Sequence, residues 1–199
     1  MERVLTAPEP PIPLPVRPRG MGSNAVLGMA LFIFTEVMAF AGFISAYMVA
    51  ENSALPGTWP PPGQPRLPVG STLINTAALL LSGVVLQLAW RTFTARGASA
   101  ARGLVGVALG LGVFFVAFQG FEWAQLLAQG LTLTSSRVGS FFFLIVGAHA
   151  LHAVAAVLAL GWCWMRLDEA GARSALAAVR LFWYFVVLMW PVIFWKVYL

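Results

Sequence analysis

Five long apolar stretches, separated by polar or proline-rich segments, run along the 199 residues of the chain. A helix needs roughly 20 apolar residues to cross a bilayer, and each stretch exceeds that length. The sequence therefore predicts an all-α integral membrane bundle of five transmembrane helices, with some tilt or interfacial overhang. The expected helices cover about Gly22–Ala50, Gly70–Ala95, Arg102–Gln129, Val138–Leu167 and Ala175–Tyr198.

The segments between these stretches interrupt helical structure. Ser53–Pro68 holds six prolines and two glycines around Trp59, so no helix is expected there. The other connections are short, which places consecutive helices side by side and antiparallel in a compact bundle. These connections are about Arg96–Ser99, Gly130–Ser136 and Asp168–Arg173.

Positive charge is distributed unequally over the two sides of this predicted bundle. Nine arginines lie on the side of the N-terminus and only three basic residues on the other, and cytoplasmic loops are the ones that carry such an excess. We therefore expect a cytoplasmic N-terminus and an exterior, periplasmic C-terminus. The nine are Arg3, Arg17, Arg19, Arg91, Arg96, Arg102, Arg166, Arg173 and Arg180; the three are Arg66, Arg137 and Lys196.

The chain divides into a proline-rich cytoplasmic N-terminal segment, residues 1–21, and a transmembrane domain, residues 22–199. Met1–Gly20 contains six prolines and three arginines but no apolar core for a signal peptide. We expect it to be uncleaved, and extended or disordered on the membrane surface.

Composition supports the membrane assignment. Hydrophobic residues make up 60% of the chain and charged residues 10%, against about 25% charged in soluble domains. The net charge of +5 is also found in nucleic-acid-binding proteins, but arginines that set topology and meet anionic headgroups explain it better. The single cysteine, Cys163, forms no intrachain disulfide or haem-attachment motif and is expected to be a small packed side chain.

Small residues recur within two of the predicted helices. They permit close backbone approach, which indicates tight helix packing or a subunit interface, although glycine is also commoner in membrane helices generally. They are Gly103, Gly106, Gly110 and Gly112 in the third stretch, and Gly147, Ala148, Ala155 and Ala156 in the fourth.

Few polar side chains lie inside the predicted spans, where an ionisable group costs about 2.5–3.5 kcal/mol near the centre. Glu36 is near the middle of the first stretch, Glu122 lies deep in the third with Gln119 one turn before it, and His149 and His152 share a face of the fourth. Structural histidines bonded to Glu36 or Glu122 are one interpretation, and a proton relay through the carboxylates is another. A metal or haem site would need more ligands than two histidines supply.

Six short motifs follow one another along the chain with consistent order and spacing. They are Leu31–Phe40 followed by Tyr47, Thr58–Gly63 around Trp59, Leu73–Thr76 with Asn75 followed by Leu81–Gly83, Gln119–Trp123, Gly139–Phe142 and Gly147–His152. Together they resemble subunit III of the haem–copper (cytochrome c) oxidases from about Ala25 to Leu199. The buried polar motif residues Glu36, Asn75, Gln119, Glu122, His149 and His152, with Trp59, are the candidate site residues.

The resemblance implies a non-catalytic subunit with no active site in this chain. Haem and copper are then expected in partner subunits and not here, with subunit I as the main contact, subunit II nearby and phospholipid bound. The subunit would support subunit I and proton uptake in a terminal oxidase of the aerobic electron transport chain. Larger family members have seven spans, so the five-helix bacterial type in the inner membrane is the one implied.

The last predicted helix departs from the family pattern. Where the family usually has histidine and aspartate, this chain has Tyr184 and Val187, and Ala148 and Ala150 replace glycines around His149. The roles of the missing histidine and aspartate are therefore not carried over, and the departures are typical of a divergent branch.

Two structural hypotheses follow. Glu36 and His149 should form a buried hydrogen-bonded pair that joins the first and fourth helices, and the small-residue faces and arginine-rich side should meet subunit I and lipid headgroups. The alternative functions are an accessory subunit of a nitric oxide reductase or of a quinol oxidase, and a stand-alone small transporter. A transporter is disfavoured because five spans do not divide into equal repeats and Pro191 is the only proline deep in a span. The electron donor, cytochrome c or quinol, is left open.

Overall fold

The helices predicted from the apolar stretches are present. The computed structural model describes residues 21–55, 57–61, 63–65 and 67–198, with side chains from Asn24 onward. The described residues form five helices long and apolar enough to cross a membrane, so the all-α membrane bundle is confirmed. These are α1 (Met21–Asn52), α2 (Val69–Arg96), α3 (Ala98–Ala128), α4 (Arg137–Met165) and α5 (Ala172–Ile193), the last continued by a π-helical turn, Phe194–Tyr198.

The predicted helix ends differ from the observed ones by at most four residues. The largest difference is at the start of α3, expected near Arg102 and found at Ala98, because Gly97 alone separates α2 from α3. Its φ of 87° is a left-handed conformation that side chains other than hydrogen tolerate poorly. The proline-rich segment 1–21 lies outside the described residues except for the backbone of Met21.

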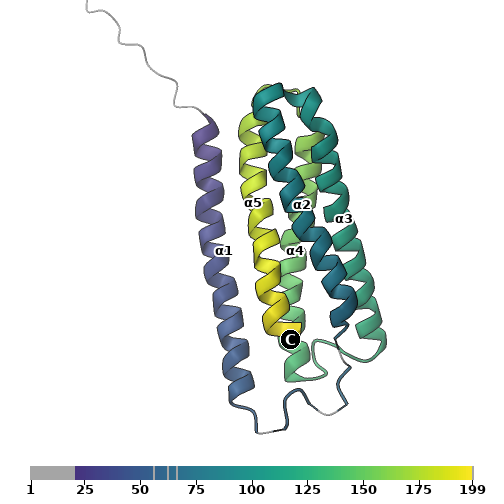
Figure 1. Ribbon diagram of the computed structural model, residues 1–199. Helices are drawn as coiled ribbons and strands as arrows, with labels where there is room; N and C mark the ends of the chain where they lie inside the picture. The colour runs from purple at the N-terminus through teal and green to yellow at the C-terminus, as the bar shows by residue number, and fades with distance from the viewer. Residues whose placement is uncertain (1–20, 56, 62, 66, 199) are drawn as a thin grey trace, which may run out of the picture.

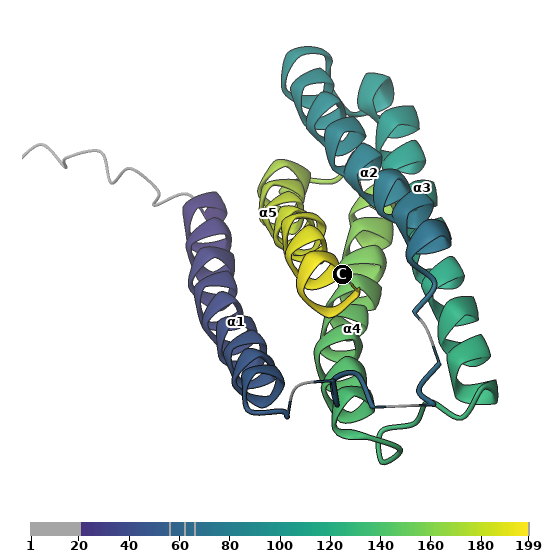
Figure 2. The same ribbon diagram turned by 60° about the horizontal axis from the view of Figure 1, so that its bottom comes forward.

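The helices run alternately up and down (Figure 1). The start of α1, the α2–α3 turn and the α4–α5 turn lie at one end, called the upper end here, and the C-terminus and the other two loops lie at the lower end. In both views α2 and α3 form one pair, α4 and α5 lie in the middle, and α1 stands at the side beside α5 (Figure 2). In the most apolar 18-residue stretch of α1 only 6% is buried within the chain, whereas in that of α5 the buried share is 56%.

Tryptophan side chains of α5 fasten it to α2 by hydrogen bonds inside the bundle. Trp183 Nε1 donates to Ser82 Oγ at 3.0 Å, and Trp190 Nε1 donates to Thr76 Oγ1 at 2.8 Å. Both indoles are almost fully buried. Since hydrocarbon offers no hydrogen-bond partner, satisfying each N–H on a neighbouring helix fixes both the register and the rotation of α5 against α2.

Two of the four glycines singled out in α3 pack against another helix. A Cβ at Gly112 would lie 2.3 Å from Trp183 Cη2, and one at Gly106 would lie 3.4 Å from Trp164 Nε1. A Cβ at Gly103 or Gly110 would meet no atom of the described residues within 4 Å beyond its local backbone. The expectation of close helix approach is therefore correct for part of this face only.

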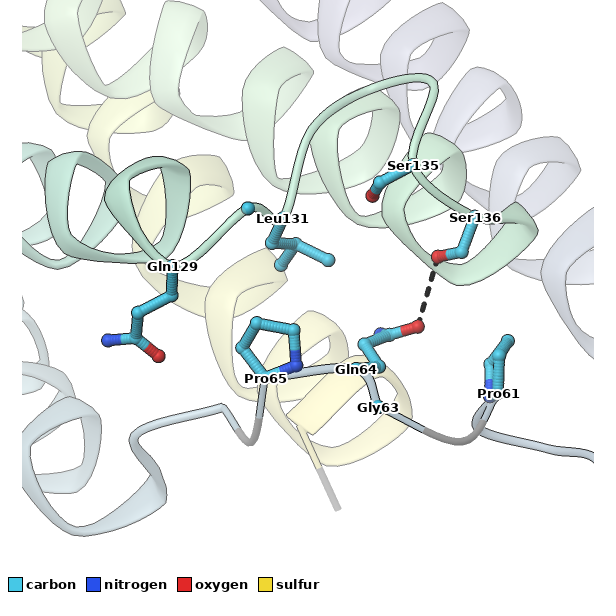
Figure 3. A pocket seen from close by; sticks show the side chains of 9 residues that line it. Pro61, Gly63, Gln64, Pro65, Gln129, Leu131, Ser135 and Ser136 are labelled. Atoms are coloured by element: carbon cyan, nitrogen blue, oxygen red, sulfur yellow. Dashed lines mark hydrogen bonds between the residues drawn. The ribbon is translucent and has the colours of Figure 1, made fainter.

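The proline-rich loop between α1 and α2 docks under the α3–α4 connection at the lower end. Ser136 Oγ donates to Gln64 Oε1 at 3.0 Å and accepts from the backbone N–H of Gly139 at 2.9 Å, so one hydroxyl caps α4 and holds the loop (Figure 3). Gly139 is required here, because a Cβ would lie 2.5 Å from the Thr132 carbonyl oxygen.

Candidate functional site

The first polar centre of the bundle lies where α1 meets the rest of the chain. Glu36 is midway along α1, on the same face as the buried side chains Phe40 and Tyr47. Its Oε2 lies 3.1 Å from Nε2 of His152, which is midway along α4. The pair therefore joins α1 to α4 about halfway through the membrane.

The hydrogen bonds of His152 define where its protons lie. Nδ1 is 2.7 Å from the Ala148 carbonyl oxygen, and a carbonyl only accepts, so Nδ1 carries a hydrogen. Nε2 is therefore an acceptor when the ring is neutral, and Glu36 must then be protonated to donate to it. When the carboxyl is ionised, an imidazolium ring donates to it from Nε2. Oε2 of Glu36 and Nε2 of His152 can therefore share one proton.

Aromatic rings surround this pair. Phe40 and Phe185 pack edge-on against His152 with centroids 5.7 and 5.6 Å away, and Phe32 and Phe182 lie at 6.4 and 6.2 Å. The side chains of Glu36 and His152 are 24% and 15% exposed within the chain. Such surroundings exclude most other hydrogen-bond partners, which strengthens the interaction within the pair.

The expected Glu36–His149 pair is wrong: Glu36 bonds to His152. The two histidines are three residues apart, and α1 approaches the side of α4 that carries His152. His149 is 1% exposed and points into the four-helix interior, against Trp190 at a ring distance of 5.0 Å and Phe115 at 6.2 Å. Neither of its ring nitrogens has a hydrogen-bond partner among the described residues. The two histidines therefore lie in different environments.

The second polar centre surrounds Glu122, which is 2% exposed. Ser71 Oγ and Thr72 Oγ1 donate to its two carboxyl oxygens, at 2.5 and 2.9 Å. Both hydroxyls belong to the first turn of α2, which has no side-chain cap of its own, so the carboxyl also faces the positive end of that helix. Glu122 is six residues from the end of α3 and so lies nearer the lower end than mid-membrane.

The hydroxyls around Glu122 can satisfy it with or without a proton. Both donate to an ionised carboxylate. When the carboxyl is protonated, it can donate to Thr72, whose own hydrogen then turns to the Pro68 carbonyl oxygen 2.8 Å away. Ser71 Oγ also lies 3.2 Å from that carbonyl oxygen. This alternative acceptor makes the centre tolerant of a change in charge.

Replacing Glu122 tests this arrangement. We expect Glu122→Gln to change the free energy of unfolding by less than about 1 kcal/mol, because the amide can accept from one hydroxyl and donate to the other. Glu122→Leu should cost only about 1–2 kcal/mol, because Ser71 and Thr72 can both turn to the Pro68 carbonyl. Thermal unfolding of the purified membrane complex measures both. A larger loss for glutamine than for leucine would contradict the assignment.

The remaining candidate residues occupy separate places. Gln119 Nε2 donates to the Tyr198 hydroxyl at 3.1 Å, which fastens the C-terminal turn to α3. Asn75 Nδ2 donates to the Phe115 carbonyl oxygen at 3.2 Å, between α2 and α3. Trp59 packs its ring against Tyr47 at the lower end, 5.7 Å between centroids. The candidates therefore form helix-to-helix contacts at several heights, and do not converge on one point.

Several polar residues of the bundle were not among the candidate site residues, although Thr76 and Ser82 lie within the sequence motifs. Ser71, Thr72, Thr76 and Ser82 all lie on the face of α2 that meets α3 and α5, and each bonds to a partner on one of those helices. The spacing of Thr72 and Thr76, four residues apart on one helical face, was the available signal. Hydroxyl residues also bond to their own helix, which is why the pattern alone does not identify them.

A metal centre finds no support in the described part of the chain, where no three His, Cys, Asp or Glu side chains lie close enough to hold an ion. Cys163 is buried and free. The described residues form a helix bundle joined by polar contacts, in which Glu36 and His152 are close enough to share a proton.

Comparison with known proteins gives a consistent result over nearly the whole chain. The family model described as "Cytochrome c oxidase subunit III" matches residues 20–199. Proteins named cytochrome c oxidase subunit 3 are similar to the chain over 179 residues, or 86% of it and 67% of their own length: those of Coturnix japonica and Petromyzon marinus at 32% identity and that of Gallus gallus at 31%.

Proposed function

Because the chain belongs to the cytochrome c oxidase subunit III family, we propose that it is a non-catalytic subunit of a bacterial haem–copper terminal oxidase. In this role it holds no haem or copper, packs on subunit I near subunit II, binds phospholipid and supports proton uptake. Family membership makes it part of an oxidase complex in a membrane. The bacterial type rests on the five-helix resemblance drawn from the sequence.

The contacts of the motif residues are the observation that best supports a non-catalytic role. Asn75 and Glu122 bond to neighbouring helices, His152 bonds to Glu36, and Trp59 packs on Tyr47. Residues with these contacts stabilise a bundle by joining one helix to the next. The 3.1 Å contact between Glu36 and His152, a pair that can share a proton, supports the proton-linked part of the proposal.

Exposed apolar side chains support the assembly. Leu27, Leu31, Phe34, Met38 and Val49 are 60%, 60%, 64%, 61% and 63% exposed along α1, which needs lipid or another subunit around it. On the other side of α5, a groove of about 470 Å³ runs between α2 and α5 from Leu80 to Arg91. Its apolar walls and single arginine fit an acyl chain with an anionic headgroup.

Purification of the membrane complex through a tag on this chain tests the proposal. Haem bands in the visible spectrum, oxygen consumption and co-purifying larger subunits are expected. Nitric oxide turnover without oxygen reduction would assign the chain to a reductase instead, and the absence of haem would favour a stand-alone transporter. Turnover with quinol or with cytochrome c identifies the electron donor.

The orientation is tested by cysteine labelling. We propose that the upper end is cytoplasmic, because Arg91, Arg96, Arg102, Arg166, Arg173 and Arg180 all belong to it. In a variant with the buried Cys163 replaced by serine, a cysteine at Glu169 should react with a membrane-impermeant maleimide only after cells are opened. A cysteine at Ser135, in the opposite loop, should react in intact spheroplasts. The reverse pattern would invert the topology.

A further inference from the structure

A partly open cavity of about 190 Å³ lies between α3, α4 and α5. Most of its wall is apolar, including Phe115, Ala153 and Trp190. Three polar side chains also line it: Gln119 and Trp123 from α3 and His149 from α4. It therefore combines an apolar wall with a few polar groups at fixed positions, near the middle of the membrane-spanning region.

Three of the residues that line the cavity carry polar atoms without partners. Both ring nitrogens of His149, Oε1 of Gln119 and Nε1 of Trp123 are buried and have no hydrogen-bond partner among the described residues. His149 is 1% exposed and Gln119 is 4% exposed. A neutral imidazole supplies one donor and one acceptor, the indole one donor and the amide oxygen one acceptor. The side chains beside the cavity thus carry two unpaired donors and two unpaired acceptors.

An occupant that satisfies these groups must both donate and accept hydrogen bonds. An acyl chain would leave all four groups unsatisfied, and so would an empty cavity, which is the state that purely apolar cavities adopt. A water molecule has two donors and two acceptors and takes up roughly 30 Å³ in the liquid. The volume and the balance of polar groups therefore suit a small cluster of water molecules.

We propose that this cavity is a hydration site inside the bundle, in which water molecules bind His149, Gln119 and Trp123. The inference rests on the geometry of this chain and stands apart from the oxidase assignment. Gln119 also affects the access of water from the lower end, because its Nε2 donates to the Tyr198 hydroxyl at 3.1 Å. Tyr198 also lines a larger pocket of about 510 Å³ that opens at the lower end beside Trp59 and Lys196. The Gln119–Tyr198 bond thus separates the hydration site from the lower surface.

Cryo-electron microscopy of the intact membrane complex, in nanodiscs of native lipid and at a resolution that shows ordered water, tests the proposal. Separate compact densities are expected within hydrogen-bonding distance of His149, Gln119 Oε1 and Trp123 Nε1. An empty cavity would overturn it. Continuous density leading out to the bilayer would also overturn it, because the occupant would then be a lipid-soluble molecule. A side chain of another subunit in the cavity would overturn it as well.

A variant pair tests the donors. Trp123→Phe removes the indole N–H but keeps an aromatic ring beside Gly147. The wild-type indole packs closely there, since a Cβ added at Gly147 would lie 3.3 Å from Trp123 Cη2. The density nearest position 123 should disappear while that at His149 stays. Trp162→Phe, at a position on α4 that is 46% exposed, is the matched control and should leave all densities in place. Unchanged density in Trp123→Phe would show that the indole does not hold water.

Discussion

Replacing Gly112 with alanine is expected to destabilise the bundle more than any other single-methyl change in α3. The new Cβ would lie 2.3 Å from Trp183 Cη2 and 2.6 Å from Cζ2, and the indole is 2% exposed with little space to move. Overpacking of this kind costs about 1–3 kcal/mol. Displacing the ring also weakens the bond from Trp183 Nε1 to Ser82, worth about 1 kcal/mol. The better helix propensity of alanine offsets about 1 kcal/mol of this sum.

The expected net loss is about 1–3 kcal/mol, measured as a lower midpoint of thermal unfolding and a smaller fraction of chain assembled in the complex. Gly110→Ala is the matched control, because no atom of the described residues outside its local backbone comes within 4 Å of a Cβ there. It should be neutral or slightly stabilising.

Shortening the ring that the new methyl group meets should rescue Gly112→Ala. Trp183→Phe alone loses the bond to Ser82 and leaves a void, so it is destabilising by itself. In Gly112→Ala/Trp183→Phe the methyl group fills part of that void. The double variant is therefore expected to be more stable than the sum of the two single losses implies. Additive losses would mean that the two side chains do not meet.

The helices could be predicted from the sequence because their causes are local. The number of apolar residues in a row decides whether a helix spans, and prolines such as those in the 53–68 segment decide where it stops. The start of α3 at Ala98 was misplaced, because a single glycine makes the α2–α3 turn and the residues after it, Ala98 to Ala101, were left out of the predicted helix. Composition does not show how short a turn can be.

The contacts between helices were predicted less well because they depend on rotation about each helix axis. His149 and His152 share a face of α4 in the sense that both point inward, yet only His152 faces Glu36. Three residues along a helix rotate a side chain by about 60° from its starting direction, which is enough to change its neighbour. Similarly, Gly110 and Gly112 look alike in sequence, but only Gly112 lies under an indole.

Removing either partner of the Glu36–His152 pair is expected to loosen α1. Glu36→Leu leaves His152 Nε2 without a partner, and His152→Leu leaves a carboxyl group facing phenylalanine rings. Each change should lower the free energy of unfolding by about 1–3 kcal/mol. The double variant Glu36→Leu/His152→Leu removes both unsatisfied groups, so its loss should be smaller than the sum of the single losses. Faster proteolysis of the loop between α1 and α2 reports the loosening. Met38→Leu, at a position 61% exposed on α1, is the control.

The Glu36→Gln variant separates two roles of the pair, the attachment of α1 and the sharing of a proton. Because His152 Nδ1 donates to the Ala148 carbonyl, Nε2 of the neutral ring is free to accept from the glutamine amide. Stability should therefore stay within about 0.5 kcal/mol of the wild-type value, whereas the amide has no acidic proton to exchange. If the shared proton supports proton uptake by the oxidase, the initial rate of oxygen reduction falls in Glu36→Gln although the subunit stays assembled. A wild-type rate in that assembled variant would confine the pair to fastening α1, since the hydrogen bond is kept and only the proton is lost.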